Sequence, residues 1–357
     1  MDLIFWINRS MNRIIDLYDQ CGTVYLSFSG GKDSTVVLKL IDMCYERGLI
    51  PRGAIPAVFA NTHLELDATL DFVNWVKENW YPWTEIIKPA VSFSSVFKNY
   101  GYPIISKMKS GELSDLQGQM KNGTVRQFRS FQRLAGIPYV GAHGQQVKIN
   151  CRLKIADKHL QVLHSEFNIP ASDDCCRLMK KKPFEEYAIT NCMLGYYTGE
   201  RLSEGGVRRY VADQRAASGS TNVCTRLHGP YIVKSPIIDW PNEIVDQFIE
   251  EYDVPLSRAY TVYGMDRTGC YLCPFGVSVE QRLEVLHKYE PRKYKAAIHF
   301  MRDVYIAQGF KLEFDPEYME EFNRQWNVKY RRMQKEMLEE LRPDSRLLKK
   351  LKKEERK

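Results

Sequence analysis

Short apolar runs alternate with amphipathic segments through the first quarter of the chain. The β-branched and aromatic residues of 23–28 predict a strand, and apolar side chains at helical spacing predict a helix over 34–47. By the same criteria we expect strands at 55–61 and 84–87, with a helix at 67–80 between them. Strands that alternate with helices form βαβ units. The pattern therefore predicts a parallel sheet with a ligand crevice at the carboxyl ends of its strands.

The rest of the chain shows the same two periodicities less regularly. We expect mainly helical structure after residue 277, and before it strands at 187–197 and 235–238 and helices at 151–167 and 242–252. Residues 92–103 are expected to form a helix and then a turn. The polar, basic stretch 106–130 is interpreted as an insertion, either a mobile lid or a solvated surface loop. The chain is thus expected to form an α/β domain over 1–240 and a cysteine-containing, mainly helical and basic region over 241–357.

The composition is that of a globular protein with a sizeable core. Of 357 residues, 44% are hydrophobic and 27% are charged. The N-terminal segment mixes charged with apolar positions, which predicts an amphipathic helix and not a secretory signal. No apolar run approaches the roughly 18 residues of a membrane span. We therefore expect no membrane segment and a cytoplasmic location.

Most of the net charge of +7 lies at the end of the chain. Residues 327–357 contain 12 Lys and Arg against 6 Asp and Glu, which leaves the preceding residues nearly neutral. A basic segment of this kind can neutralise nucleic-acid phosphates, and it is equally typical of a solvated helix end.

A glycine pair joins the first predicted strand to its helix, in the sequence Ser29-Gly30-Gly31-Lys32-Asp33-Ser34. Glycines let backbone N–H groups approach an anion closely, the helix N-terminus adds donors and a favourable dipole, and Lys32 adds a charge. The pattern differs from the Walker A loop and from the GxGxxG dinucleotide motif. A tight turn with Ser34 as helix cap is the alternative, but it leaves the lysine and the aspartate unexplained.

Two further segments follow predicted strands, where a Rossmann-type sheet contacts its nucleotide. Asn61 and Thr62 end the second strand. Gly199, Arg201 and Arg208 follow the strand expected to end at 197. Arginine on such a loop can bind phosphate oxygens in pairs, so this segment predicts phosphate binding.

Nine cysteines are an odd number, which argues against a purely disulfide framework. Four of them form a CC…CxxC set, Cys175, Cys176, Cys270 and Cys273. Four thiolates can hold zinc or an iron–sulfur cluster. Adjacent thiolates reach one small zinc ion with difficulty, so a [4Fe–4S] cluster is preferred over zinc and over four unrelated buried thiols. Cys151 and Cys224 lie among basic residues that would stabilise a thiolate, and either could carry sulfur.

The glycine–lysine–aspartate loop resembles the PP-loop of the adenine-nucleotide α-hydrolase superfamily. The segment from Gly199 to Arg208 and the four cysteines are similar to those of the phosphoadenosine phosphosulfate (PAPS) reductase family within it. In its motifs the chain looks most like the cluster-containing sulfurtransferases of DNA phosphorothioation and the adenylylsulfate (APS) reductases, over roughly residues 23–276. The resemblance implies an α/β fold, a Rossmann-like parallel sheet flanked by helices, with the helical C-terminal region as an extension.

The resemblance also implies which residues act. Lys32, Asp33 and Arg201 would be catalytic, and the cysteines at 175, 176, 270 and 273 would hold a [4Fe–4S] cluster. ATP with Mg²⁺ would be bound by Ser29, Gly30, Gly31, Lys32, Asp33, Ser34, Asn61, Thr62, Gly199, Arg201 and Arg208.

The activity implied by the resemblance is ATP-dependent sulfur transfer. An acceptor oxygen, on DNA or on a tRNA base, would be adenylylated with release of pyrophosphate, and sulfur would then displace AMP. A cysteine desulfurase is the candidate sulfur donor.

Two other functions stay open. An APS or PAPS reductase would release sulfite, but such reductases commonly have a degenerate phosphate loop and a cysteine in a C-terminal Glu-Cys-Gly-type motif. This sequence has an intact loop and no cysteine after Cys273. A non-enzymatic regulator would bind nucleotide, cluster and DNA without turnover. Pyrophosphate release would distinguish the sulfurtransferase from the regulator, and sulfite release would establish the reductase.

Overall fold

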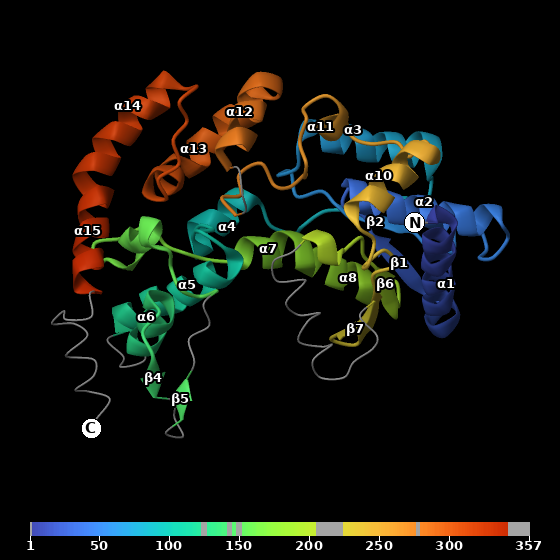
Figure 1. The fold of residues 1–357 in the computed structure, drawn as a ribbon, viewed down its shortest axis with the longest axis horizontal. Helices are drawn as coiled ribbons and strands as arrows, with labels where there is room; N and C mark the ends of the chain where they lie inside the picture. Colours follow the sequence, from blue (N-terminus) through green and yellow to red (C-terminus); the bar gives the residue numbers. More distant parts are fainter. Residues whose placement is uncertain are drawn as a thin grey trace. The chain divides into compact units, whose positions relative to one another are not determined.

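The computed structural model describes residues 2–122, 127–140, 145–147, 152–204, 224–275 and 279–341. The chain forms two compact units, each made of two segments that are distant in sequence (Figure 1). Unit 1 comprises Met1–Ala90 and Leu178–Cys270, and unit 2 comprises Val91–Arg177 and Tyr271–Lys357. The sequence analysis expects a single boundary near residue 240. Amino-acid patterns do not show which distant segments pack together, so units made of two segments could not be predicted.

Unit 1 contains a six-stranded sheet in the order β3-β2-β1-β6-β8-β7. All neighbouring strands are parallel except β7 and β8, which are antiparallel. The strands are β1 (Val24–Ser27), β2 (Ala57–Ala60), β3 (Thr84–Ile87), β6 (Gly195–Tyr197), β7 (Thr225–His228) and β8 (Tyr231–Lys234). Strands β2 and β3 extend the sheet on one side of β1, and β6 extends it on the other. This reversal places the expected ligand crevice at the carboxyl end of β1.

Helices cover both faces of this sheet, as predicted from the sequence. They are α1 (Leu3–Cys21), α2 (Lys32–Glu46), α3 (Asp67–Trp75) with the π-helical turn η1 (Val76–Trp80), η3 (Arg177–Lys181), α8 (Lys182–Thr190), the short turn η4 (Leu202–Glu204), α10 (Asn242–Glu251) and α11 (Arg258–Thr261). The predicted class, a Rossmann-like and mostly parallel sheet between helices, is confirmed.

Successive residues of the central strands face opposite layers, as the period of two requires. Leu26 and Phe59 belong to the core that the strands form with α1, α2 and α10. Tyr25 and Val58, one position earlier in each strand, pack instead with Tyr187 of α8. The two faces differ in chemistry, because the α8 face is rich in tyrosine.

Helix α1 is attached to unit 1 by an apolar stripe and by a polar cluster. Its buried apolar residues Leu3, Ile7, Met11, Ile14 and Leu17 recur every three or four positions, which is the spacing of one helix face. The predicted amphipathic helix at the N-terminus is therefore present.

The polar cluster ties α1 to the turn before α10. Arg13 donates to both carboxylate oxygens of Asp239, at 2.7 and 2.9 Å, and Arg9 lies 2.9 Å from the same carboxylate. Burial opposes ionisation of Asp239, but the hydrogen bonds from Arg13 and the two positive charges outweigh it and lower the pKa of this carboxyl group. The indole of Trp240 donates to Ser10 Oγ at 2.9 Å. These contacts fix the position at which α10 begins.

The strand predicted at 187–197 is largely wrong. Helix α8 continues to Thr190, and β6 occupies Gly195–Tyr197 only. Pro183 in the first turn of α8 and Tyr187 are both buried, four positions apart, which is helical spacing. Tyr187 therefore belongs to the buried face of a helix, whereas Ile189, which also favoured a strand, is 71% exposed near the end of that helix.

The strand predicted at 235–238 lies four positions too late. Strand β8 covers Tyr231–Lys234, and the following residues form turns in which Ile238 N–H bonds to Ser235 O and Trp240 N–H bonds to Ile237 O. The partner strand β7 was not predicted. It joins β8 through a tight turn in which Gly229 has a φ of +58°.

Unit 2 is mainly helical. It contains α4 (Phe93–Tyr100), α5 (Lys107–Asn122), α6 (Gln127–Ala135), η2 (Asp157–Leu163), α7 (Asp174–Cys176), α12 (Val279–Tyr289), α13 (Pro291–Ala307), α14 (Pro316–Gln325), η5 (Trp326–Tyr330) and α15 (Arg331–Glu340). A two-stranded antiparallel ribbon pairs β4 (Tyr139–Val140) with β5 (Gln146–Val147). The predicted helical C-terminal region is thus observed as far as it is described. Among the described residues, no helix combines the length and the apolar character needed to cross a membrane.

The interpretation of 106–130 as a lid or surface loop is wrong for its described residues. Most of them form helix α5, in which Leu113 and Leu116 are buried. The buried Ser110 hydroxyl donates to Ile104 O and accepts from Ile104 N–H, both at 2.7 Å. The helix predicted at 151–167 is reduced to the 3-10 helix η2, between residues with extended backbone at Ala156 and His164.

The apolar stripe of α1 yields a direct test of how unit 1 is held together. Ile14 is fully buried, whereas Ile4 in the same helix is 62% exposed. Ile14→Ala should lower the free energy of unfolding by about 2–5 kcal/mol, because it removes buried methyl groups and leaves a cavity. Ile4→Ala is the matched control and should change it by less than about 0.5 kcal/mol. Equal effects in denaturant titrations would contradict the docking of α1 described above.

Candidate nucleotide-binding site

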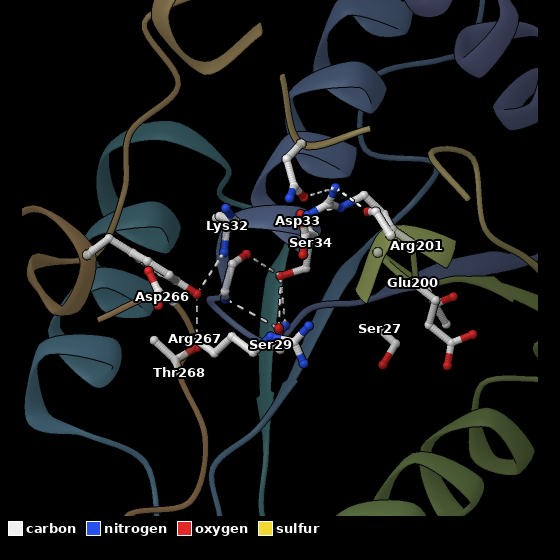
Figure 2. Close-up of a pocket in the computed structure, with 16 residues that line it drawn as sticks. Ser27, Ser29, Lys32, Asp33, Ser34, Glu200, Arg201, Asp266, Arg267 and Thr268 are labelled. Atoms are coloured by element: carbon white, nitrogen blue, oxygen red, sulfur yellow. Dashed lines mark hydrogen bonds and ion pairs between the residues drawn. The ribbon is translucent and has the colours of Figure 1, made fainter. Parts of the chain in front are cut away.

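The predicted phosphate loop lies at the carboxyl end of β1 and leads into α2 (Figure 2). Gly30 has a φ of +67°, a conformation that L side chains rarely adopt. A Cβ at Gly30 would also lie only 3.0 Å from Thr69 Cγ2 and 3.1 Å from Val73 Cγ2 of α3. Backbone conformation and packing both require glycine here, where the loop leads into the N-terminus of α2, a position that suits an anion.

Hydroxyl groups keep the loop closed on itself. Ser29 Oγ lies 3.0 Å from Ser34 Oγ and accepts the Gly31 N–H at 3.3 Å. Ser34 and Thr35 both donate to Gly31 O, at 2.8 and 3.0 Å. Figure 2 shows the side chains of Ser29 and Ser34 facing each other across the loop. Ser34 therefore bridges the two ends of the loop, as well as lying in the first turn of α2.

A segment far along the chain supports the loop from the other side. Tyr260 in α11 accepts the Lys32 N–H through its hydroxyl at 3.1 Å, and this hydroxyl lies 3.3 Å from Thr268 Oγ1. A Cβ at Gly31 would approach both oxygens to about 3.2–3.3 Å. The sequence analysis missed Tyr260, because nothing in the sequence around it resembles a phosphate-binding motif.

Arg201 and Asp33 form a buried ion pair beside the loop. The Nε–H of Arg201 donates to Asp33 Oδ1 at 2.8 Å, and Arg201 is only 2% exposed. Its NH1 group donates to Ser203 Oγ at 2.7 Å, to Asn242 Oδ1 at 3.0 Å and to Trp240 O at 3.2 Å. These contacts hold Asp33 in a fixed orientation at the start of α2.

Gly199 brings the loop after β6 against the same turn of α2. A Cβ at Gly199 would lie 2.7 Å from Ser34 N and 2.8 Å from the carbonyl carbon of Asp33. Both neighbours are backbone atoms and cannot rotate away. The glycine–arginine segment thus packs against the glycine loop and the start of α2.

A cavity of about 580 Å³ opens over these elements. Its lining is polar and includes Ser27, Ser29, Gly31, Lys32, Asp33, Ser34, Thr198, Gly199, Glu200, Arg201, Ser203, Asn242, Tyr260, Asp266, Arg267 and Thr268. Lys32 Nζ lies 3.7 Å from Asp246 Oδ1, a separation at which the charge is only weakly paired. In Figure 2 the side chain of Arg267 extends toward Ser29. Arg267 was not among the predicted site residues.

A second cavity of about 260 Å³ lies next to the first and suits a planar ring. Phe28, Phe59 and Phe184 contribute apolar surface to it. Among the described residues, Thr69 Oγ1 is buried without a hydrogen-bond partner, and Thr69 lines this cavity. A buried orphan hydroxyl is expected to find a partner in a ligand. The glycine cradle and this hydroxyl together fit an adenine nucleotide, with phosphates in the first cavity and the ring in the second.

Asn61 and Thr62 shape the loop after β2. Asn61 Oδ1 accepts the N–H of His63, whose φ is +61°, at 3.0 Å. Thr62 bonds to the buried carboxylate of Glu65 through its N–H at 3.0 Å and through its hydroxyl at 2.8 Å. Neither Asn61 nor Thr62 lines the two cavities as they are described. Glu65 does line the second one, with Lys180 Nζ 3.8 Å from its Oε1.

The other predicted residues are not tested by this geometry. Arg208 and Cys151 lie outside the described residues. Cys270 belongs to unit 1, whereas Cys175, Cys176 and Cys273 belong to unit 2. Within the described ranges, no three His, Cys, Asp or Glu side chains are grouped as a metal site would require. The four-thiol site therefore stays a prediction from the sequence.

The glycine cradle, the buried ion pair and the adjoining ring cavity are typical of a site that binds a nucleotide. Residues 23–110 match the sequence profile of the phosphoadenosine phosphosulfate reductase domain. This match spans β1, the loop, α2, β2 and β3, and it confirms the family resemblance predicted from the motifs. A comparison with curated protein sequences finds no match.

Two solved structures resemble the chain at low sequence identity. One is the phosphoadenylyl-sulfate (PAPS) reductase from Candida auris in a phosphate complex, with 15% identity, 73% of this chain and 87% of that chain covered, and a TM-score of 0.42. The other is the U34-tRNA thiolase NcsA from Methanococcus maripaludis with its [4Fe-4S] cluster, with 14% identity, 86% and 80% covered, and a TM-score of 0.34. Both TM-scores are below 0.5, so neither likeness carries an argument about activity.

The close approach of Gly199 to α2 predicts a binding defect. In Gly199→Ala the new methyl group must displace Ser34 N and the Asp33 carbonyl. Loss of one charge-assisted hydrogen bond to a phosphate should weaken ATP binding by about tenfold or more, as measured by calorimetry. Gly118→Ala in α5, where a Cβ would meet nothing within 4 Å, is the control and should bind ATP like the wild type. Wild-type affinity in Gly199→Ala would show that this contact does not shape the cradle.

Proposed function

We propose that this protein is an ATP-dependent sulfurtransferase that adenylylates a nucleic-acid acceptor. The observation that carries the proposal is the complete phosphate cradle, in which a positive-φ glycine, two hydroxyls and a lysine surround the N-terminus of α2. The family profile over residues 23–110 supports chemistry on adenine nucleotides that is linked to sulfur. A reductase has less need of the complete cradle, because it does not break ATP.

The proposed reaction has two steps. An acceptor oxygen attacks the α-phosphorus of ATP, the bond to the bridging oxygen breaks, and pyrophosphate leaves with Mg²⁺ neutralising part of its charge. A sulfur nucleophile then attacks the activated acceptor atom, and AMP leaves with the former acceptor oxygen. Adenylylation is required because an unmodified oxygen is a poor leaving group.

The residues of unit 1 divide this work among them. The N-terminus of α2 beyond Lys32, together with the Lys32 side chain, would bind the phosphate oxygens and stabilise the charge that develops on them. The N–H groups of Gly31 and Lys32 donate instead to Ser29 and Tyr260. Arg201 acts on the phosphates through Asp33 and the start of α2, since its guanidinium is buried against that carboxylate. We therefore regard Arg201 as a positioning residue, and Lys32 and Asp33 as the residues nearest the reacting groups.

Cys175, Cys176, Cys270 and Cys273 would hold the [4Fe–4S] cluster. Four thiolates with CxxC spacing are a suitable donor set, and such a cluster supplies iron sites that bind or orient sulfur. A cysteine desulfurase is the proposed sulfur donor, and the proposed location is the cytoplasm. A DNA backbone and a tRNA base are both acceptors in keeping with this chemistry.

The name of the matching domain favours a second candidate, a sulfonucleotide reductase. It would cleave APS or PAPS to sulfite and the corresponding nucleotide. Anaerobically prepared protein incubated with each sulfonucleotide and a thiol reductant distinguishes the two functions. Sulfite release without AMP formation from ATP would replace the sulfurtransferase proposal by the reductase.

Substitution of Lys32 tests the role of the loop in ATP cleavage. Lys32→Met should lower the rate of AMP and pyrophosphate formation by about 10²-fold, because it removes a charge from the site where the phosphates react. Lys39→Ala removes a lysine from the same helix that lines none of the described cavities, and should leave the rate unchanged. An unaltered rate in Lys32→Met would exclude this loop from the chemistry.

Metal analysis tests the cluster. Protein purified without oxygen should contain iron and acid-labile sulfide in equal amounts, and Cys273→Ser should lose most of both. Cys192→Ser, at an exposed cysteine outside the CC…CxxC set, should retain both. An iron-free wild type with one zinc per chain would replace the cluster by a zinc site.

A further inference from the structure

Unit 1 has a third cavity, of about 400 Å³, whose walls are largely aromatic. We call it the aromatic pocket. It is lined by Tyr25, Ser27, Lys181, Phe184, Glu185, Tyr196, Thr198, Glu200, Arg226, His228 and Tyr231. Its volume lies in the range of about 300–1,000 Å³ that is typical of small-molecule sites. The ATP-binding role proposed above does not use it.

The strand register explains why these side chains share one face of the sheet. Tyr25 of β1 is paired with Tyr196 of β6, Tyr196 with Val233 of β8, and Val233 with Arg226 of β7. Paired residues of neighbouring strands project from the same face. Tyr231 and His228 form the next pair on that face, two positions along their strands. The pocket therefore lies on the α8 side of the sheet.

The rings form a platform on which a planar group can stack. Tyr25 stacks with Tyr196 at a centroid distance of 5.3 Å and an angle of 24°, and with Phe184 at 6.0 Å and 11°. Tyr25 is buried beneath the other two, which are only half-buried. Burial raises the pKa of Tyr25 and of Tyr196, so both hydroxyls stay neutral at physiological pH. Near-parallel, uncharged aromatic rings suit a nucleobase.

Charged groups surround this platform. Arg226 lies 2.6 Å from Glu200, and together they present donors and an acceptor at the wall of the pocket. Lys181 lines the pocket from the turn before α8. A base edge can pair with the donors and acceptor, and a phosphate flanking the base can meet the cations. A bare aromatic metabolite would use only the platform.

The aromatic pocket adjoins the candidate ATP site. Ser27, Thr198 and Glu200 line both this pocket and the phosphate cavity, and Ser27 and Phe184 also line the ring cavity. A group stacked on Tyr196 thus lies next to the cavity proposed for the phosphates of ATP. Such a position is what an acceptor requires.

We propose that the aromatic pocket receives one unstacked nucleobase of a single-stranded nucleic acid, and so holds the acceptor for adenylylation. The inference rests on the proposed function and names its second substrate site. Enzymes that modify nucleotides often take the target base out of its stack into such a pocket. Tyr196, Phe184 and Tyr25 would form the platform for the base, the pair of Arg226 and Glu200 would face its edge, and Lys181 would meet a flanking phosphate.

Binding of short single-stranded DNA and RNA oligonucleotides, followed by fluorescence anisotropy at fixed salt, tests this site. Tyr196→Leu should weaken binding of the preferred oligonucleotide by about tenfold, because loss of one stacking contact is worth that much. ATP affinity should stay within about twofold. Tyr196→Phe should retain wild-type oligonucleotide binding, since the ring is kept. Phe5→Leu changes an exposed aromatic residue of α1 that lines none of the described cavities, and should have no effect.

Two outcomes would overturn the inference. A parallel loss of ATP affinity in Tyr196→Leu would show that the pocket holds the adenine of ATP, and unchanged oligonucleotide binding would show that no base enters it. Photo-crosslinking of a halogenated oligonucleotide, with the attached peptide identified by mass spectrometry, reports on the site without turnover. A crosslink at Tyr196 or Tyr231, which line the aromatic pocket and neither of the other two cavities, in protein that forms no AMP would preserve this site and remove the proposed function. AMP formation together with crosslinks only at other residues would retain the proposed function and remove this site.

Discussion

The ion pair between Asp33 and Arg201 is the interaction on which the nucleotide site depends. Each charge is largely removed from water, so each needs the other to be stable where it is. The pair forms because residue 199 is a glycine. The loop after β6 lies so close to the backbone of α2 that there is no room for a Cβ at this position. Asn242 and Trp240 complete the shell of Arg201, and Trp240 is in turn bonded to α1 through Ser10. The loop after β6, the start of α10 and helix α1 together fix the first turn of α2.

This constraint changes the role given to Arg201. The sequence favours direct phosphate binding, because an arginine after a strand in a nucleotide-binding sheet can reach phosphate oxygens. In the structure, its Nε and NH1 groups are occupied by protein acceptors. Lys32 and Arg267 also line the cavity, and Lys32 Nζ lies 3.7 Å from Asp246, so these two cations are the remaining candidates for neutralising phosphate charge. A positioning arginine is consistent with a cradle that keeps its shape whether or not nucleotide is bound.

Patterns within a short stretch of sequence predicted the part of the candidate site that is formed by consecutive residues. The strand β1, the glycine loop and α2 are consecutive, so period, glycine pair and helix start could all be found in one short stretch. Prediction failed where a strand-like pattern crosses the end of a helix. Tyr187 was predicted to lie in a strand, but it belongs to α8 and packs against the sheet from there. Tyr260 and Thr268 could not be predicted, because the bond from Lys32 N–H to Tyr260 and the contact of Tyr260 with Thr268 depend on how distant segments pack together. The aromatic pocket likewise depends on strand order, which pairs Tyr25 with Tyr196 and places Arg226 in the same row.

The order of the strands also explains why the phosphate cavity, the ring cavity and the aromatic pocket adjoin one another in unit 1. The carboxyl end of β1 is the point from which the chain extends the sheet in both directions, and Ser27 at that end lines all three cavities. Towards β2, the walls are apolar and include the orphan hydroxyl of Thr69, which suits a buried ring. Towards β6 and β8, the walls are stacked tyrosines with charged neighbours, which suits a ring that carries phosphates. A phosphorus atom held over the α2 N-terminus would lie between the two rings, so the reacting groups would be brought together by the sheet itself and without a change in its strands.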